Sequence, residues 1–296
     1  MATAVLGIIG GSGVYDLPGI TDLREVRIDS PWGRPSDVLR RGRMGETEVV
    51  FLPRHGRGHR YAPSAINYRA NIDILKRAGV TDLVSISACG SYREELAPGQ
   101  FVLVDQIVDR TVGRAGSFFG NGCVAHVSMA DPVGPALRAR IAAAAAAENI
   151  DVRMGGTALC IEGPQFATRA ESLTYRAAGY DIVNMTCMPE AKLAREAEIT
   201  YALVAMVTDY DCWHAAHAAV DVAALLRVLA DNAERVQRLV ARVAVDFPAE
   251  HEPCPIGSDR ALDHAILTQP QARDPALLAR LDAIAGRVLG CAGEPS

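Results

Sequence analysis

The sequence predicts an α/β fold with a mixed, largely parallel central sheet flanked by helices. Short, nearly continuous apolar runs alternate with segments of helical periodicity along most of the 296 residues. Such runs are typical of strands that are buried on both faces of a parallel sheet. Small, hydroxyl-bearing or basic residues follow several runs, at the carboxyl ends where open α/β sheets bind ligands.

The first two predicted strands both lead into segments that suit an anion. The strand over 4–9 runs into the glycine-rich turn 10–13, where backbone N–H groups and the Ser12 hydroxyl can approach an anion. This turn lacks the lysine of a P-loop and the third glycine of a dinucleotide fingerprint, so a plain tight turn is the alternative. The strand over 48–52 leads into RHGRGHR at 54–60, a cationic loop that favours phosphate or remains simply solvated.

The middle of the chain continues the alternation of helices and strands. We predict a helix over 63–79, strands over 83–86 and 101–107, a helix over 135–149 and a strand over 157–161. The strand over 83–86 is followed by small and hydroxyl-bearing residues at 87–91. After the strand over 157–161, the Gly163-Pro164 turn presents Phe166 either as a stacking platform or as a core residue.

The stretch 183–213 is the clearest candidate site. An apolar lead-in reaches Met185 and Thr186, and a short helix follows with Pro189 in its first turn. The apolar run 200–207 then predicts a buried strand, which ends in Thr-Asp-Tyr-Asp at 208–211. If the backbone stays extended there, Asp209 and Asp211 point to the same side. The pair predicts a site, and helix-capping or loop aspartates are the alternative.

The C-terminal third predicts two helical regions separated by a linker. Apolar residues from 222 to 243 recur at helical spacing and indicate a long amphipathic helix. Prolines interrupt 250–255, and Asp274-Pro275 then begins a helix with an apolar stripe from 277 to 288. We therefore predict one main domain over 1–249 and a linker with a helical tail over 250–296, which packs on the main body or on a neighbouring subunit.

Composition excludes several classes of partner. The net charge of −5 gives no general attraction to nucleic acid or to an anionic membrane surface. No apolar run approaches the roughly 20 residues of a membrane helix, and the N-terminus lacks the basic region of a signal peptide, so we expect a cytoplasmic protein. The seven cysteines are scattered and never in CxxC spacing, which argues against zinc, another metal centre or a disulfide framework.

Ten collinear segments between about residues 5 and 245 resemble the trimeric purine nucleoside phosphorylase family, and most closely its branch that acts on 5′-methylthioadenosine. They are GIIGGSG at 7–13, RHG at 54–56, NYRANI at 67–72, SACGS at 87–91, DQIVDRT at 105–111, IEGPQF at 161–166, RAES at 169–172, VNMT at 183–186, PEAKLAREAEI at 189–199 and TDYDCW at 208–213. The resemblance implies a single-domain fold of that family and phosphorolysis of a nucleoside, with inorganic phosphate as co-substrate and no cofactor.

The resemblance also implies roles for individual residues. The implied phosphate site is Ser12, Arg54, His55, Ser87, Ala88 and Thr186. Met185 is implied to lie against the ribose, and Phe166 and Ala167 beside the base. Asp209 and Asp211 are implied to face the purine N7 and the 6-amino group. Asp209 would act as the general acid, and Asp211 would either orient Asp209 or accept a hydrogen bond from the amino group. The implied pocket for the 5′ substituent is Val222, Leu225 and Leu226, completed by His126 of a neighbouring subunit, hence a homotrimer.

The chain departs from the family pattern at three positions, of which the first two leave base preference open and the third removes one possible disulfide. Gln165 stands where an arginine is common, Ala167 replaces a serine, and Cys254 lacks the second cysteine of a CxC motif. The main expectation is cleavage of methylthioadenosine. The alternatives are phosphorolysis of 6-oxopurine nucleosides or of another 5′-substituted adenosine, a catalytically idle nucleoside-binding protein, and, from the glycine turn alone, a dinucleotide oxidoreductase.

Overall fold

The computed structural model describes residues 3–214 and 222–290, with backbone alone for 222–226. Its centre is a parallel array in which β1 (Val5–Gly10) lies between β4 (Thr47–Pro53) and β5 (Asp82–Ser91), and β11 (Thr200–Asp209) pairs with the other edge of β5. These four strands are almost wholly buried, as their continuous apolar runs predict. The predicted α/β class and the largely parallel sheet are confirmed.

Shorter strands extend the array into a mixed sheet of eleven strands within the described residues. Antiparallel neighbours are β2 (Thr21–Val26) on β3 (Leu39–Met44), β3 on β4, β6 (Phe101–Leu103) on β11, and β10 (Ile182–Asn184) on β5. Parallel neighbours are β8 (Val152–Met154) on β6, β9 (Thr157–Ile161) on β10, and β7 (Gln106–Arg110) on β9.

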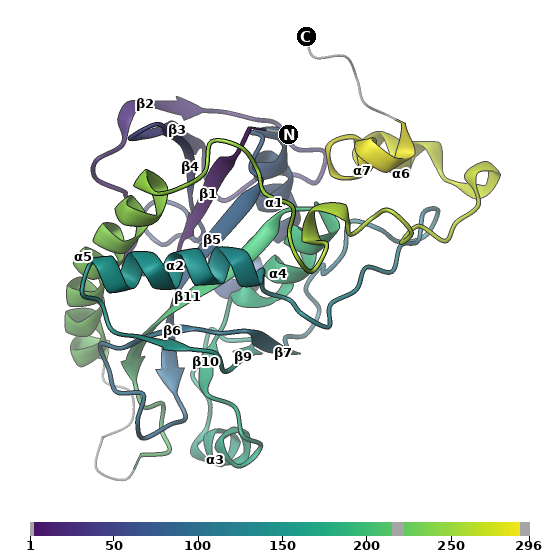
Figure 1. The fold of residues 1–296 in the computed structure, drawn as a ribbon. Helices are drawn as coiled ribbons and strands as arrows, with labels where there is room; N and C mark the ends of the chain where they lie inside the picture. Colours follow the sequence, from purple (N-terminus) through teal and green to yellow (C-terminus); the bar gives the residue numbers. More distant parts are fainter. Residues whose placement is uncertain (1–2, 215–221, 291–296) are drawn as a thin grey trace.

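Helices cover the sheet on two faces and define two cores. One core contains α1 (Tyr68–Arg77) and α4 (Cys187–Glu196), and the other contains α2 (Pro135–Ala147) and α5 (Val222–Val245), which pack on each other (Figure 1). Successive residues of β1 alternate between the cores, with Ile8 in the second and Ile9 in the first. The remaining α3 (Arg169–Ala177) begins with a capping box and buries only Ser172.

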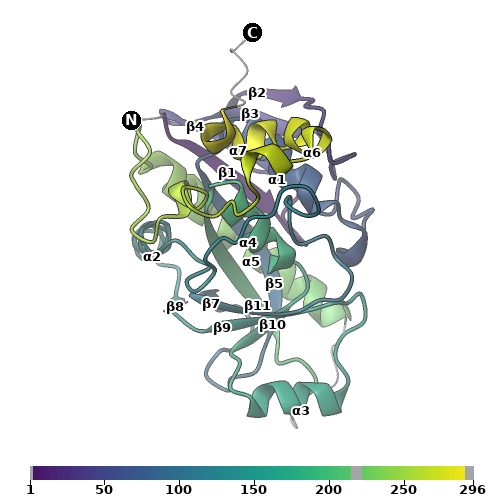
Figure 2. The ribbon, with the colours of Figure 1, turned by 90° about the vertical axis from the view of Figure 1, so that its right-hand side faces the viewer.

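The C-terminal tail packs on the main body. It contains two short 3₁₀ turns, η2 (Ser258–Arg260) and η3 (Pro270–Ala272), and the helices α6 (Pro275–Arg280) and α7 (Asp282–Leu289), which lie beside α1 at the end of the molecule opposite α3 (Figure 2). Ile284 is buried in the first core, and the Arg287 Nε donates to Glu198 at 2.7 Å. None of the described helices is long and apolar enough to cross a membrane.

Several predicted boundaries were wrong. The strand predicted over 83–86 continues to Ser91, because small residues fit inside a sheet that is covered on both faces. The strand predicted over 101–107 is two strands, since Asp105 leaves the ladder to accept from the Gly156 N–H at 3.2 Å. The helix predicted from residue 63 begins with the separate turn η1 (Pro63–Ala65) and starts again after the Asn67 cap. The single tail helix is broken at residue 281.

A buried carboxyl group fixes the loop before residue 120 to α4. The Glu196 carboxylate accepts from the Phe118 backbone N–H and from the Ser117 hydroxyl, both at 2.7 Å. Burial raises the pKa of Glu196 to about 7 from its ordinary value of 4.5. The folded protein therefore holds a proton that the unfolded chain has released over this range.

We expect the free energy of unfolding to fall as the pH rises from about 4.5 to about 7, by at most about 1.4 kcal/mol per pH unit from this group. The sign follows because native protons exceed unfolded protons in this window. Denaturant titrations of the wild type and of Glu196→Gln at several pH values measure the effect. In Glu196→Gln, the free energy of unfolding should no longer show this part of its dependence on pH. The same pH dependence in the variant and the wild type would contradict the raised pKa of Glu196.

Candidate active site

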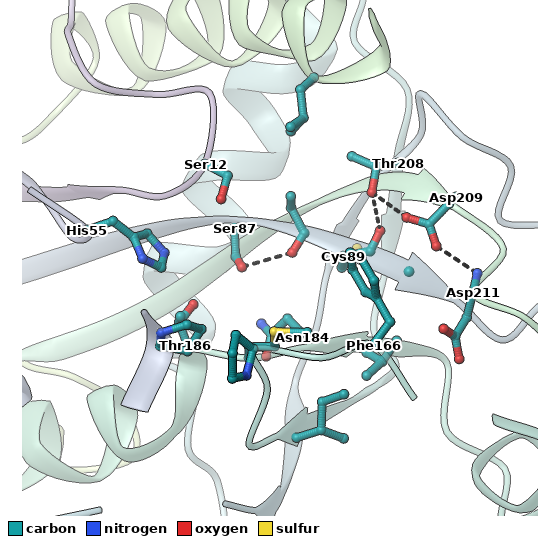
Figure 3. A pocket seen from close by; sticks show the side chains of 18 of the residues that line it. Ser12, His55, Ser87, Cys89, Phe166, Asn184, Thr186, Thr208, Asp209 and Asp211 are labelled. Atoms are coloured by element: carbon teal, nitrogen blue, oxygen red, sulfur yellow. Dashed lines mark hydrogen bonds between the residues drawn. The ribbon is translucent and has the colours of Figure 1, made fainter. Parts of the chain in front are cut away.

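A single cavity of about 250 Å³ opens where the central strands end (Figure 3). β1 delivers Ser12, β4 delivers Arg54 and His55, and β11 delivers Asp209. At one end, which we call the anion end, lie the side chains of Ser12, His55, Ser87 and Thr186. Arg54 and Ala88, the sequence neighbours of His55 and Ser87, also line the cavity and are counted with this end. At the other, the carboxylate end, lie Asp209 and Asp211. The structure thus brings together residues that are up to 199 positions apart in the sequence, from Ser12 to Asp211.

Arg54 is fully buried and its charge is already paired. Its Nε donates to the Glu190 carboxylate at 2.7 Å, and its Nη2 donates to the same carboxylate at 3.1 Å and to the Ser85 hydroxyl at 2.6 Å. Its Nη1 donates to the Ile86 carbonyl at 3.0 Å. A Cβ at Gly11 would lie 2.8 Å from that Nη1, so only glycine lets the first turn approach Arg54.

Sequence reasoning did not find Glu190, although it lies in the segment 189–199 that carried the resemblance. Its neighbours in the sequence indicate only a short helix, and a glutamate on a helix is ordinarily exposed. Its burial at 1 % exposure follows from the position of α4 against the strand ends, which only the tertiary structure determines.

His55 is buried at the anion end in one defined orientation. Its Nδ1 lies 2.8 Å from the Tyr61 carbonyl oxygen, and its ring stacks on His59 with centroids 4.2 Å apart. Burial, opposed by the Tyr61 bond and helped by the nearby Arg54 and His59, lowers the pKa of His55 to about 4. His55 is therefore neutral at pH 7. In the described part of the chain, no cluster of three or more His, Cys, Asp or Glu side chains is placed to hold a metal ion.

The three hydroxyl groups of the anion end come from separate elements. Ser12 follows β1, Ser87 lies within β5, and Thr186 is the residue before the first turn of α4. The Ser87 hydroxyl donates to the Ala88 carbonyl at 3.0 Å and can rotate toward a ligand. Together with the start of α4, these groups offer hydrogen-bond donors to an anion.

The carboxylate end does not keep the extended backbone that the sequence suggested. β11 ends at Asp209, and Asp211 has a left-handed φ of 51°, so the chain turns between the two residues. The turn brings the Asp211 N–H to 2.7 Å from the Asp209 carboxylate, which accepts it. Both side chains nevertheless line the cavity, and the buried Asp211 carboxylate faces the hydroxyl groups of Ser172 and Tyr92.

Burial favours a proton on Asp209, whereas the hydrogen bonds to its carboxylate oppose one. The Thr208 hydroxyl oxygen lies 3.1 Å from the Cys89 carbonyl and 2.7 Å from the Asp209 Oδ2, but it carries one hydrogen. The Thr208 hydroxyl donates to the Asp209 carboxylate over the shorter of the two contacts, and the Asp211 N–H donates to the same carboxylate, so both hydrogen bonds favour the charged form. Burial raises the pKa of Asp209, and burial together with the charge of Asp209 raises the pKa of Asp211.

An aromatic ring and a thioether lie along the remaining wall. Phe166 lines the cavity and is 50 % exposed, which rules out its alternative role as a core residue. Met185 lines the cavity as well, and its carbonyl accepts from the Arg114 guanidinium at 2.7 Å. The same guanidinium donates to the Glu162 carbonyl at 2.5 Å, so Arg114 joins the segment of Phe166 to that of Met185.

Two predicted residues, Ala167 and His126, do not line the cavity. Ala167 is partly buried, and its carbonyl accepts from the Cys212 thiol at 3.3 Å. His126 is exposed and does not line the cavity of its own chain. The side chains of Val222 and Leu225, like that of Leu226, lie outside the described residues. Leu229, one turn further along the same helix, does line the cavity and is 6 % exposed.

Residues 5–244 match the phosphorylase superfamily, and the chain belongs to that superfamily. It is 67 % identical over 289 residues to S-methyl-5′-thioadenosine phosphorylase of Bradyrhizobium diazoefficiens, covering 98 % of this chain and 99 % of that protein.

Solved structures give the same picture. A methylthioadenosine phosphorylase from an antarctic soil metagenomic library superposes with a TM-score of 0.89 at 43 % identity, covering 96 % of this chain and 99 % of that one. An S12T mutant of the Schistosoma mansoni adenosine/methylthioadenosine phosphorylase, in complex with methylthioadenosine, superposes with a TM-score of 0.78 at 38 % identity, covering 84 % and 93 %.

Proposed function

We propose that this chain is a pentosyltransferase that cleaves S-methyl-5′-thioadenosine with inorganic phosphate, giving adenine and 5-methylthioribose 1-phosphate. The observation that carries the proposal is one cavity that joins hydroxyl and guanidinium groups at one end to a pair of buried carboxyl groups, whose pKa values burial raises, at the other. The relatives that share this fold along nearly the whole chain bear names that specify this substrate.

The proposed reaction transfers the sugar from nitrogen to oxygen. Phosphate at the anion end attacks the anomeric carbon, the bond from that carbon to the purine nitrogen breaks, and its electron pair moves onto the base. The proton on Asp209 passes to N7, which stabilises the leaving purine. Holding phosphate beneath the sugar lowers the barrier by making the attack effectively unimolecular, an effect worth up to about 7–11 kcal/mol in well-oriented systems.

Asp211 supports the choice of adenine over a 6-oxopurine. Its buried carboxylate, which faces the hydroxyl groups of Ser172 and Tyr92, is an acceptor at the cavity wall, and an exocyclic amine offers a donor where a 6-oxo group offers another acceptor. Phe166 and Met185 both line the cavity, which supports stacking of Phe166 on the base and contact of Met185 with the ribose. The apolar wall of Val222 and Leu225 for the methylthio group rests on the sequence, and the position of Leu229 on the same helix supports it.

A homotrimer in the cytoplasm is part of the proposal. His126 is exposed outside the cavity of its own chain, beside the exposed apolar side chains of Val124 (39 %) and Leu267 (60 %). This combination supports a subunit contact through which His126 reaches a neighbouring cavity. The six described cysteines are free thiols, which supports a reducing compartment. Sedimentation equilibrium tests the assembly.

The deciding experiment measures adenine release from methylthioadenosine, with adenosine and inosine in parallel, each with and without phosphate. We expect release that depends on phosphate and is fastest with methylthioadenosine. Release without phosphate would make the protein a hydrolase and contradict the assignment of the anion end. Preference for inosine would keep the mechanism and overturn the role of Asp211.

A further inference from the structure

The anion end carries little net positive charge for a site that holds phosphate. Arg54 is the permanent cation among its described residues, and Glu190 neutralises it at 2.7 Å. Ser12, Ser87 and Thr186 contribute neutral hydroxyl groups. Hydrogen bonds, more than net charge, therefore decide which anion fits, and the direction of each hydrogen bond matters.

The direction of the His55 hydrogen bond is fixed by its partner. The Tyr61 carbonyl only accepts, so the Nδ1 of His55 carries the hydrogen of their 2.8 Å bond. The Tyr61 backbone N–H returns a bond to the His55 carbonyl at 3.1 Å, which fixes the spacing of the two residues. The Nε2 of this buried ring has no hydrogen-bond partner among the described residues, and the ring lies at the anion end (Figure 3). A neutral ring with hydrogen on Nδ1 presents Nε2 as an acceptor.

The groups around His55 oppose a second proton on the ring. Arg54 precedes it in the chain, and the Glu190 carboxylate of α4 is paired with that guanidinium. His59 stacks on the ring, and its Nδ1 lies 2.8 Å from the Tyr15 hydroxyl. The ring is 4 % exposed, so an imidazolium there would lack solvation as well as a direct anionic neighbour in the chain.

We propose that Nε2 of His55 accepts a hydrogen bond from the P–OH group of hydrogen phosphate, so that the anion end selects a protonated tetrahedral oxyanion over sulfate. This inference rests on the proposed function, because it takes phosphate as the ligand of this end. Hydrogen phosphate has one P–OH donor and three acceptor oxygens. The anion end matches it with one acceptor, the Nε2 of His55, and with donors from the hydroxyl and guanidinium groups. Sulfate carries no proton at neutral pH, so its oxygen would face the Nε2 lone pair unless the ring takes up a proton from solvent.

The test is direct binding of phosphate, arsenate and sulfate to the full chain by calorimetry at pH 7.5, in buffers with different ionisation enthalpies. We expect phosphate and arsenate, which both carry a proton, to bind about tenfold or more tighter than sulfate, the value of one charge-assisted hydrogen bond. Sulfate binding should take up a proton and strengthen as the pH falls. Equal affinities for phosphate and sulfate without proton uptake would overturn the inference.

A variant separates the acceptor from the rest of the ring. In His55→Asn the amide can keep the bond to Tyr61 but leaves nothing at the position of Nε2, so phosphate should weaken and the preference over sulfate should fall close to one. Tyr15→Phe, which removes the contact to His59 and does not line the cavity, should keep the preference. A preference that persists in His55→Asn contradicts the inference. If the wild type binds none of the three anions, the proposed phosphate site itself fails.

Discussion

Asp209→Asn should lower kcat for methylthioadenosine by about 10²–10⁴-fold, the usual value of general acid catalysis. Asparagine matches the volume of the carboxyl group but has no proton that it can transfer to N7. It also places an amide where the aspartate faces Thr208 at 2.7 Å and accepts from the Asp211 N–H at 2.7 Å. Steady-state adenine release at saturating phosphate measures the loss.

The matched control is Asp151→Asn, which removes an exposed carboxylate that does not line the cavity. Its kcat should equal that of the wild type. Phosphate affinity of Asp209→Asn, measured by calorimetry, should also be retained because the anion end is intact. A kcat for Asp209→Asn within about threefold of the wild type would refute the acid role.

Glu190→Gln should lower the free energy of unfolding by about 3–5 kcal/mol, because it leaves the buried Arg54 charge without a partner. The wild-type carboxylate accepts from Arg54, from the Ser85 hydroxyl at 2.6 Å and from the Tyr201 hydroxyl at 3.2 Å. A neutral amide cannot replace the charge and adds two hydrogens to a site filled with donors. Urea denaturation with and without phosphate measures the change.

Phosphate should partly restore the stability of Glu190→Gln. An anion next to an unpaired guanidinium binds more tightly to the folded state, so added phosphate should stabilise the variant more than the wild type. The control is Glu252→Gln, whose partner Arg140 lies 3.0 Å away on the surface, and whose loss should cost less than about 1 kcal/mol. Equal destabilisation by the two substitutions would contradict the account of Arg54.

The elements that the sequence predicted best are those with both faces buried. The runs 4–9, 48–52 and 200–207 became β1, β4 and β11 with shifts of one or two residues, since a strand covered by helices on both faces needs continuous apolar side chains. β2 was missed because it is almost wholly exposed and has no such pattern. α3 was missed for a similar reason, as it buries a single side chain.

The residues of the candidate site also differ in whether the sequence alone could predict them. Side chains of unusual type at strand ends, such as Arg54, His55 and Asp209, can be recognised from sequence because a parallel sheet collects its carboxyl ends at one edge. Their partners cannot be recognised in this way. Glu190 reaches Arg54 through the packing of α4, and Tyr61 reaches His55 through the loop after β4; nothing in their local pattern distinguishes them from a helix surface or a turn.

By itself, the sequence determined the α/β class, the four central strands and several of the polar residues that line the cavity. Only the tertiary structure decided their states: Arg54 paired with Glu190, His55 neutral with hydrogen on Nδ1, and Asp209 buried so that its pKa is raised. The physical reason is the distance along the chain between the residues that determine each feature. Apolar periodicity is written within a few residues, whereas burial and the direction of a hydrogen bond depend on groups that are distant in the chain and meet only when the sheet is covered.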